Sequence, residues 1–563
     1  MYHSNRLIIK NIIIMLKKIN ILLLVISFIT ITSCSEDFLE TKPTDAISSA
    51  DALATADNMG LILQGLHRGL YSQSQTILPG GNTARAGEHY WVPMGDNLAG
   101  GVIHSSRANN LSWQNTTQWI DHTQETSLTN EILWYHRYNI IASSNAIINK
   151  ATDGTIPEDA RLKEIIGQAY TYRAYAYLSL VQHYGKGYLI GNPSSDAGVP
   201  LLFSSDAPFT SAPRSTVQAI YDQCMLDINS AIGYFQGATD RPTGTPAGKS
   251  QLNIDVAYGI KARIALNSGQ WRIAADAAKL ARQNYPIMGE SDWKAGFNTN
   301  SLPEVIWGSN VIGAETTYFR SYFYLMSNTF NGSQIRGNPK IADRRLVDII
   351  PDTDYRKDVF LIDAPNSSSS ASNGQGGWAN NTNPLYTTEA EFKAEIARIK
   401  ALYGMVSGHR THPYMHMKQK QKNPGSIDPD DIIYMRSSEM YLIEAEAEAM
   451  LNNVTGAQNA LKPLGEARDS AYDVTVYNNQ TSLMEHIKFQ RGLELWGEGF
   501  LYLDKIRWDE GIDHAANGGS GASEVLYQDG FSQQKPSVNN DWIFKIPQAE
   551  IDANPNISPS DQN

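Results

Sequence analysis

Hydrophobic side chains recur at steps of three and four residues along much of the chain, which is the spacing of a helix buried along one face. The clearest stripe lies between Gln168 and Tyr184, and Gly185 ends it. Its members are Tyr170, Arg173, Ala174, Tyr177, Leu180, Val181 and Tyr184. Similar patterns predict helices over Asp51–Tyr71, Thr129–Ala151, Thr216–Phe235, Ile254–Leu266, Arg272–Gln283, Ser438–Leu451, Ala457–Ala471 and Leu483–Trp496. Most of these helices follow one another as pairs joined by short turns.

One helical pair, over residues 254–286, carries small residues where its two helices would cross. The pattern consists of Ala262, Gly269, Trp271, Ala274, Ala281 and Pro286, and its offsets resemble the tetratricopeptide repeat. Small side chains let the helices pack closely, glycine allows the turn, and proline follows the second helix. We therefore predict a mainly α fold, a tetratricopeptide-like scaffold of helical pairs with long irregular, loop-rich insertions and a few short strands.

Two long stretches, about 72–128 and about 285–430, lack a sustained helical period. The first is rich in Gly, Asn, Ser, Thr and Trp, and the second includes the polar run 366–383. Loops of this length are uncommon in compact domains unless they are functional. Within the second stretch, Glu304–Trp307 predicts a short strand. We expect a helical scaffold decorated by elaborate surface loops.

The N-terminal segment 1–33 has the features of an export signal. Lys17 and Lys18 precede an almost wholly apolar run, 19–31, that is too short to span a bilayer comfortably. Small residues then lead into Cys34, an arrangement that resembles the bacterial lipoprotein signal. We predict that Cys34 is lipidated and anchors the protein to a membrane that the chain does not span. The alternative is a soluble secreted protein in which Cys34 is incidental.

Charge and cysteine content narrow the classes of partner and of stabilising bond. The signal carries Arg6, Lys10, Lys17 and Lys18 but no acidic residue, so its removal changes the formal charge from −12 to −16. An acidic chain of this kind is not expected to bind nucleic acid. With Cys34 acylated, only Cys224 remains, so no intramolecular disulfide can form. Stability must then come from packing.

Several sequence blocks resemble, in the same order, those of the SusD/RagB outer-membrane lipoproteins of Bacteroidetes. The blocks are Cys34–Glu40, Tyr172–Leu178, Tyr184-Gly185, Val199–Leu201, Arg214–Val217, Ala262–Leu266, Glu304–Trp307, Arg436–Glu439, Glu444–Ala447, Arg491–Gly499, Ile546-Pro547, Asn554-Pro555 and Gln562-Asn563. Each block alone is weak, but their shared order over nearly the whole mature chain identifies it as a member of this family. One departure is that this chain lacks the arginine common at the start of the helix signature and has Gly167 or Gln168 there.

The resemblance implies a signal peptide over 1–33 and one SusD-like domain over 34–563. It also implies a surface-exposed protein, lipid-anchored in the cell outer membrane, that binds oligosaccharide or polysaccharide and delivers it to a SusC-like TonB-dependent transporter. The resemblance does not name the sugar. A lid lipoprotein for peptide or another non-glycan nutrient is one alternative, because fold alone does not determine the ligand.

Glycan capture needs flat aromatic faces against the C–H faces of pyranose rings, with amides and carboxylates for the hydroxyls, and loops display such groups. The predicted glycan-binding residues are Trp91, Asp96, Asn97, Trp113, Trp119, Tyr318, Tyr322 and Trp378. The last three rest only on resemblance of location, since family members bring binding residues from both loop regions together. The alternative is that these aromatic residues anchor the loops to the scaffold.

No catalytic residue is predicted, although a surface glycoside hydrolase is a second alternative. A glycosidase needs two carboxylates that face one bond. Acidic residues are concentrated in the segment that carries Glu439, Glu444, Glu446 and Glu448, and this segment is a predicted helix. There we expect them to face solvent or to pair with Arg436, Arg468 or Arg491.

No metal or cofactor is predicted either. His409, His412 and His416 could bring two imidazoles together, but Pro413 interrupts a helix there and no cysteine or acid completes a metal-binding set. The sequence also lacks a phosphate-binding glycine loop and a nucleophile elbow. The function that we expect is therefore binding.

Overall fold

The structure is a computed structural model of the 563-residue chain. It describes Met15 and residues 49–73, 85–104, 113–204, 211–242, 245–333, 335–367, 376–513 and 532–563. The chain divides into two compact units, Met1–Asn58 and Met59–Asn563. Cys34 and the predicted signal peptide, apart from Met15, lie outside the described residues. Within the described ranges, no helix is both long enough and apolar enough to span a membrane.

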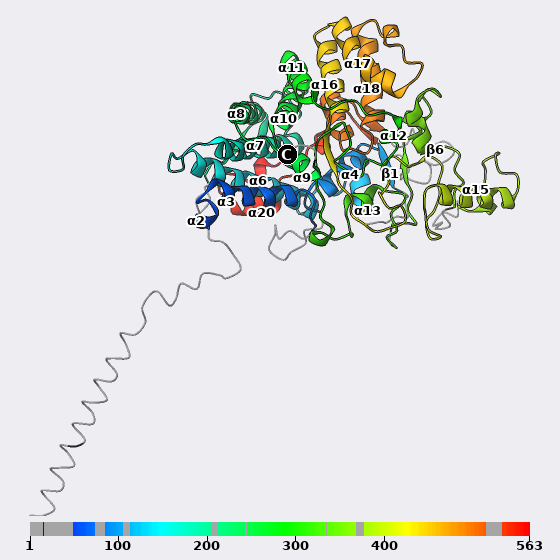
Figure 1. Ribbon diagram of the computed structural model, residues 1–563, viewed down its shortest axis with the longest axis horizontal. Coiled ribbons are helices and arrows are strands. Elements are labelled where there is room, and N and C mark those ends of the chain that lie inside the picture. Colours follow the sequence, from blue (N-terminus) through cyan, green and yellow to red (C-terminus); the bar gives the residue numbers. More distant parts are fainter. Residues whose placement is uncertain are drawn as a thin grey trace, which may run out of the picture. The chain divides into compact units, whose positions relative to one another are not determined.

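Long helices that pack in pairs form the scaffold of the second unit (Figure 1). They are α6 (Leu128–Ala151), α7 (Ala160–Tyr184), α8 (Val217–Phe235), α10 (Ile254–Asn267), α11 (Trp271–Arg282), α16 (Ser437–Met450), α17 (Val454–Arg468) and α18 (Gln480–Glu494), while α3 (Ala56–Gly69) contains the boundary between the units. Helix α7 packs against both α6 and α8, α10 packs against α11, and α16 packs against α17. The predicted mainly α fold is confirmed.

Helices α10 and α11 show how the local sequence produces a helical pair. Ala262, Ala274 and Ala281 are fully buried, as small residues at a helix crossing should be. Gly269 has a φ of 73° in the connecting turn, a left-handed conformation that the Cβ of other residues disfavours. Asn253 caps α10 by accepting a hydrogen bond from the backbone N–H of Val256. The predicted pattern therefore matches the observed helix boundaries.

Helices α16, α17 and α18 enclose one apolar cluster, near the top of Figure 1. Leu442, Leu461, Leu464, Leu483 and Ile487 are almost completely buried within it. Burial of each side chain of this size contributes about 1.5–3 kcal/mol relative to exposure. This part of the scaffold is held together by packing.

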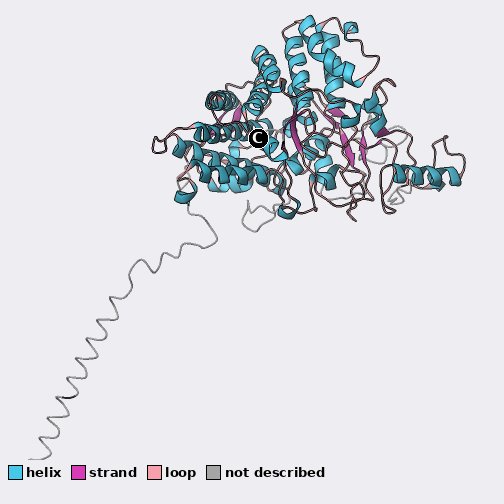
Figure 2. Cartoon of the chain, viewed as in Figure 1, coloured by secondary structure: helices cyan, strands magenta, loops and turns pink. Residues whose placement is uncertain are grey.

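The remaining elements are short, and the strands are interspersed among the helices (Figure 2). The shorter helices are α2 (Ser49–Ala52), α4 (Glu88–Leu98), α5 (Trp113–Thr117), α9 (Pro246–Ser250), α12 (Glu290–Trp293), α13 (Tyr322–Met326), α14 (Arg344–Val347), α15 (Glu389–Leu402), α19 (Leu501–Trp508) and α20 (Gln548–Ala553). Helices α12 to α15 occupy the second predicted loop region, where short segments of helix alternate with irregular chain.

One antiparallel sheet joins the two predicted loop regions. Its strand order is β1 (Val102–His104), β5 (Lys340–Ala342), β7 (Met415–His416) and β6 (Phe360–Leu361). Val102 pairs with Ala342, and Ile341 pairs with Met415. Two-stranded pairs are β2 (Ala197–Pro200) with β3 (Arg214–Thr216), β4 (Val305–Gly308) with β8 (Ile433–Arg436), and β9 (Ile512–Asp513) with β10 (Ser532–Gln533). The strand predicted around Trp307 is thus present as β4.

Helix α4 lies within the stretch 72–128, where the sequence pattern predicted no helix. Every residue of α4 except Val92 is buried. Polar and apolar side chains alike are therefore packed against other parts of the protein. The sequence of the helix shows no apolar stripe opposite a polar, solvent-exposed face. Pro93 inside the helix weakens the local signal further. The helix depends on its tertiary surroundings.

Candidate functional site

Residues 311–321 of the second loop region lie against the C-terminal end of α3, at the start of the first loop region. An Arg68 Nη2–H group donates a 3.2 Å hydrogen bond to the carbonyl of Glu315, and the Tyr71 hydroxyl donates to a Glu315 carboxylate oxygen at 3.4 Å. Gln73 Oε1 accepts a hydrogen bond from a backbone N–H of the same segment at 3.3 Å. The two loop regions, distant in sequence, therefore meet at this surface.

The aromatic residues of this segment combine an exposed ring with an anchored one. The side chain of Tyr318 is 46% exposed. Phe319 is half-buried and packs with its ring centroid 5.4 Å from that of the fully buried Tyr324. The guanidinium of Arg320 lies 5.5 Å from the centre of the Phe319 ring. Tyr318 is thus an aromatic face presented to solvent on a segment whose neighbouring side chains are fixed by packing.

Charged side chains lie on the same segment as Tyr318 and on the end of α3 that this segment contacts. Arg68 and Glu315 form an ion pair with a 3.4 Å separation, and both side chains are more than one-third exposed. Burial lowers the pKa of Arg320, and the nearby cation Arg85 lowers it further. Arg68, Tyr71, Glu315, Tyr318, Phe319 and Arg320 together are called the Tyr318 platform. It offers one aromatic face for apolar C–H groups, with a carboxylate and guanidinium groups that can bind hydroxyls.

The predicted site residues on α4 have a different environment from Tyr318. Trp91, Asp96 and Asn97 are at most 5% exposed. The Asp96 carboxylate accepts hydrogen bonds from the backbone N–H groups of Gly499, at 2.8 Å, and Leu501, at 3.2 Å. Burial raises the pKa of Asp96 to about 7, although these two hydrogen bonds act to lower it. These contacts join α4 to the start of α19, so the three side chains lie inside the protein.

Trp91 also borders a small polar cavity of about 130 Å³. The charged groups that line the cavity are already paired, since Arg137 contacts Glu88 at 2.6 Å and Arg491 contacts Asp504 at 2.8 Å. A cavity of this size and polarity is suited to a few ordered water molecules. Its paired lining gives no sign of a glycan site.

The two predicted tryptophans of the first loop region are also buried. Trp113 is 1% exposed and stacks on Tyr90, with ring centroids 5.2 Å apart. Trp119 is 3% exposed, and its ring centroid lies 4.7 Å from that of Trp542. The Trp119 N–H group donates a 2.9 Å hydrogen bond to the carbonyl of Leu98. These contacts are the ones expected if the two tryptophans anchor the loops to the scaffold.

The other two predicted residues of the second loop region lie in separate surroundings. Tyr322 is 5% exposed, and its hydroxyl donates a 2.8 Å hydrogen bond to the carbonyl of Gly497. Trp378 is half-buried and its ring centroid is 6.0 Å from that of Phe392 on α15. The structure therefore places Tyr318 alone, among the predicted residues, on the Tyr318 platform. Whether the others contact glycan stays a prediction.

The other polar members of the platform were not predicted from the sequence. Arg68 lies near the end of a predicted scaffold helix, and Glu315 is an isolated acidic residue in a predicted loop region. Sequence spacing carries no signal that relates residue 68 to residue 315, because only the tertiary fold brings them together. The run of aromatic side chains from Tyr318 to Tyr324 is the one sequence signal at this surface.

The acidic side chains of α16 are neutralised by arginines. Each of four carboxylates forms an ion pair with an arginine. The pairs are Glu439 with Arg263 at 2.7 Å, Glu444 with Arg282 at 2.6 Å, Glu448 with Arg272 at 2.8 Å, and Glu446 with Arg507. The prediction of scaffold ion pairs is confirmed. The predicted partners were wrong, because α10, α11 and α19 bring their own arginines to α16.

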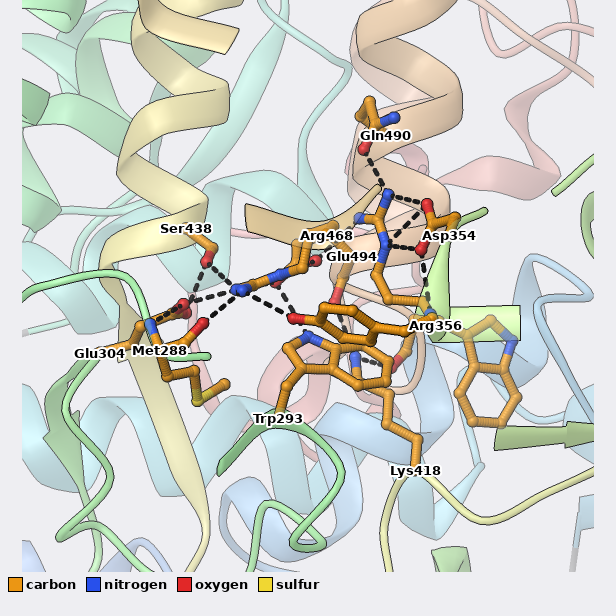
Figure 3. A network of polar contacts seen from close by, with 12 residues as sticks. Met288, Trp293, Glu304, Asp354, Arg356, Lys418, Ser438, Arg468, Gln490 and Glu494 are labelled. Atoms are coloured by element: carbon orange, nitrogen blue, oxygen red, sulfur yellow. Dashed lines mark hydrogen bonds and ion pairs between the residues drawn. The ribbon is translucent and has the colours of Figure 1, made fainter. Parts of the chain in front are cut away.

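Arg436 and Arg468 instead join a buried network with Glu304 and Glu494. Figure 3 shows Arg468, Glu304 and Glu494 in this network. The Glu494 carboxylate contacts Arg436 at 2.6 Å, Arg468 at 3.1 Å and Arg356 at 2.8 Å, and the Glu304 carboxylate also contacts Arg436 and Arg468. Burial acts to raise the pKa of Glu494, but the three guanidinium groups hold it well below its usual range. The Glu494 carboxylate is therefore held ionised as a structural group, and it is not poised as a general acid.

Among the described residues, no group of three or more His, Cys, Asp or Glu side chains could hold a metal ion. His409 and His416 each contact a backbone carbonyl through Nε2, of Phe330 at 3.0 Å and of Met326 at 2.8 Å. These histidines take part in loop packing.

Two family profiles match the chain. One is described as "SusD family" and matches residues 290–563, and the other is described as "Starch-binding associating with outer membrane" and matches residues 86–266. A curated relative, SusD-like protein P38 of Formosa agariphila, is 22% identical over 528 residues, which cover 88% of this chain and 92% of the relative. These matches extend over both the helical scaffold and the loop regions.

Solved structures agree on the fold. A SusD-like carbohydrate-binding protein from Bacteroides vulgatus has a TM-score of 0.69 and 22% identity, covering 90% of this chain and 98% of that protein. Surface glycan-binding protein A from Bacteroides thetaiotaomicron, solved in complex with laminarihexaose, has a TM-score of 0.59 and 14% identity, covering 89% and 98%. The two family profiles, over residues 86–266 and 290–563, and the curated relative show that the chain belongs to the SusD/RagB family.

Proposed function

We propose that this chain is a cell-surface lipoprotein that binds glycan at the Tyr318 platform and delivers it to a SusC-like TonB-dependent transporter. The observation that carries the proposal is the exposed ring of Tyr318, on a loop segment whose Glu315 is held by an ion pair with Arg68. An aromatic face with adjacent hydrogen-bonding groups meets the chemical requirement for a sugar ring. The laminarihexaose bound by a structural relative supports the ligand class.

Isothermal titration against a panel of oligosaccharides tests the ligand class and the platform together. We expect the wild-type chain to bind at least one glycan, and Tyr318→Ala to weaken that binding at least about tenfold, which corresponds to 1.4 kcal/mol. Tyr234→Ala, on a partly exposed tyrosine of α8, is the matched control and should bind as the wild type does. A peptide panel in parallel tests the alternative cargo.

Two results would contradict this proposal in different ways. If no glycan bound to the wild-type chain, the glycan-binding function would be wrong. If a glycan bound with the same affinity to Tyr318→Ala and to the wild type, the ligand class would stand and the platform would not be its site. Neither substitution should alter stability greatly, because both side chains are partly exposed.

The membrane anchor and the transporter partner are separate parts of the proposal. We expect the wild-type protein to fractionate with outer membranes and to co-purify with a TonB-dependent transporter. Cys34→Ala should release the protein into the soluble fraction, because the acyl chains supply the membrane affinity. A wild-type protein that is soluble, or whose membrane binding is unaffected by Cys34→Ala, would contradict the lipid anchor.

We also propose that the chain is not a glycosidase. The α16 carboxylates and the Glu304 and Glu494 carboxylates are all paired with arginines, so none of them is free to face a glycosidic bond as a catalytic acid or base. Incubation of the purified protein with the polysaccharides that it binds should release no reducing sugar. Release of reducing sugar that one carboxylate substitution abolishes would overturn this conclusion.

A further inference from the structure

A cavity of about 420 Å³ lies between α6, residues 200–204 and 211–212, and α20. Its described lining consists of Trp134, Tyr135, Tyr138, Asn139, Ile141, Ala142, Asn145, Pro200, Leu202, Ser204, Ser211, Ala212, Glu550, Ala553 and Asn554. None of these residues belongs to the Tyr318 platform. The volume falls within the range of about 300–1,000 Å³ that is typical of small-molecule sites. This cavity is called the α6–α20 pocket.

Hydrogen bonds from α6 fix one wall of the pocket. The Tyr138 hydroxyl donates to the carbonyl of Pro200 at 2.8 Å, and the Asn145 amide donates to the carbonyl of Leu202 at 2.9 Å. Asn145 is itself held by Arg173, which donates to its Oδ1 at 2.9 Å. The chain after β2 therefore has a defined position against α6.

Contacts from α20 fix the opposite wall. The Trp134 N–H group donates to a Glu550 carboxylate oxygen at 3.4 Å. The Asn554 amide donates to the other Glu550 oxygen at 2.9 Å and to the carbonyl of Ala212 at 3.0 Å. α20, red in Figure 1, is thus tied to α6 and to the chain before β3. The pocket is formed by side chains that are already ordered, which lowers the entropic cost of binding.

The groups left for a ligand are apolar surfaces and a few neutral polar groups. Ile141, Ala142 and Leu202 contribute aliphatic surface, and the half-buried Tyr135 contributes an aromatic ring. Among the described residues, the Tyr135 hydroxyl has no hydrogen-bond partner. Burial raises the pKa of Tyr135 to about 12, so this hydroxyl remains a donor at neutral pH. The amide of the exposed Asn139 lies at the same pocket.

The lining selects against ligands of other chemistry. Glu550 is the only carboxylate or cationic side chain among the described lining residues, so the pocket has no cation to bind phosphate or sulfate. An acyl chain would bury the amides and hydroxyls of the pocket without giving them hydrogen-bond partners, and each polar group buried in this way costs free energy. An aromatic ring, aliphatic surface, the Tyr135 hydroxyl and the Asn139 amide fit the faces and the hydroxyls of a neutral sugar ring.

We propose that the α6–α20 pocket is a second glycan subsite, which accepts a neutral sugar residue independently of the Tyr318 platform. The inference rests on the proposed function, because the ligand class is the same. A long polysaccharide that occupied both sites would bind more tightly than a short oligosaccharide, since the second contact becomes intramolecular. Short oligosaccharides should occupy each site separately.

The test fills the pocket without touching the platform. Ala142→Trp places a large side chain in the lining, and Ser143→Trp, on the adjacent position of α6 and outside the lining, is the matched control. Isothermal titration uses laminarihexaose, maltohexaose and cellohexaose. We expect the bound ligand to fall from two equivalents to one in Ala142→Trp but not in Ser143→Trp. In the Tyr318→Ala background, Ala142→Trp should abolish the remaining binding.

A second variant and a measurement on the wild-type chain cover the case in which Ala142→Trp does not fold. Tyr135→Phe removes only the free hydroxyl and should weaken the second site about three- to tenfold. Hydrogen exchange of the wild type should show added protection in α6 and around residues 200–204 on addition of the hexasaccharide that binds. Circular dichroism of each variant establishes that it is folded.

The outcomes separate this inference from the proposed function. Failure of the wild-type chain to bind any of the hexasaccharides or the wider glycan panel contradicts glycan binding as a whole. Binding of one equivalent that Tyr318→Ala abolishes, with no effect of Ala142→Trp or Tyr135→Phe and no added protection in α6, overturns only the second subsite. Loss of the second equivalent in Ala142→Trp and weaker binding in Tyr135→Phe support it.

Discussion

Replacement of Asp96 by asparagine should change how the stability of the protein depends on pH. The Asp96 carboxyl is 2% exposed and accepts hydrogen bonds from the backbone N–H groups of Gly499 and Leu501. Burial raises its pKa from 3.8 to about 7, and the two hydrogen bonds only partly offset this effect. The folded protein therefore binds the Asp96 proton more tightly than the unfolded chain does.

The sign and size of the effect follow from this difference in proton affinity. A raised carboxyl pKa in the folded state contributes stability that is complete below about pH 4 and is lost as the pH rises through about 7. Between pH 5 and pH 8, the loss from Asp96 amounts to about 2–3 kcal/mol. Asparagine cannot ionise, so the variant lacks this loss. Relative to the wild type, Asp96→Asn should gain about 2–3 kcal/mol over this pH interval.

Urea unfolding of both proteins at pH 5, 6, 7 and 8 measures this change. The difference in the free energy of unfolding between variant and wild type should shift steadily in favour of the variant as the pH rises. Asp222→Asn, at an exposed position of α8, is the control and should follow the wild type at every pH. A constant difference between Asp96→Asn and wild type would refute the reasoning. Glycan titration of the same variant tests the prediction that Asp96 binds ligand.

Two further predictions concern the buried aromatic and ionic groups. Trp119→Ala should lower the free energy of unfolding by about 3–5 kcal/mol, because it removes a buried ring that packs on Trp542; a loss below about 1 kcal/mol in urea unfolding would contradict an anchoring role. Arg468→Met should cost about 3–5 kcal/mol, because Glu304 and Glu494 would keep buried charges that have lost a partner. Adding Glu304→Gln to Arg468→Met should recover part of that loss, and a purely additive double variant would show that the ion pair is not coupled.

Helix α10 was accessible to sequence reasoning because its signals are local. Residues 254–266 were predicted as a helix, and α10 covers Ile254–Asn267 because its caps and small residues act locally. The helix predicted from Gln168 begins earlier, at Ala160, where Asp159 accepts a hydrogen bond from the backbone N–H of Leu162. Such a capping contact lies outside the apolar stripe, so periodicity alone placed the start of α7 too late.

The candidate site was less accessible to sequence reasoning than the scaffold. Tyr318, Trp119 and Trp91 all appear as aromatic residues in polar, loop-like sequence, yet only Tyr318 is substantially exposed. An aromatic side chain suits a sugar face and a buried anchor equally well, so residue type could not separate the two roles. The exposure of an aromatic ring depends on which parts of the chain pack against it, as Trp542 packs against Trp119.

By itself, the sequence determined the mainly α fold, the helical pairs and the family, because these depend on periodicity, small residues at helix crossings and the order of many short blocks. Only the tertiary structure decided which side chains meet. It brought Arg68 to Glu315, buried Asp96 beneath α19, and formed the α6–α20 pocket from three segments that are far apart in the chain. Contacts of this kind arise when distant segments pack together, and no spacing along the chain encodes them.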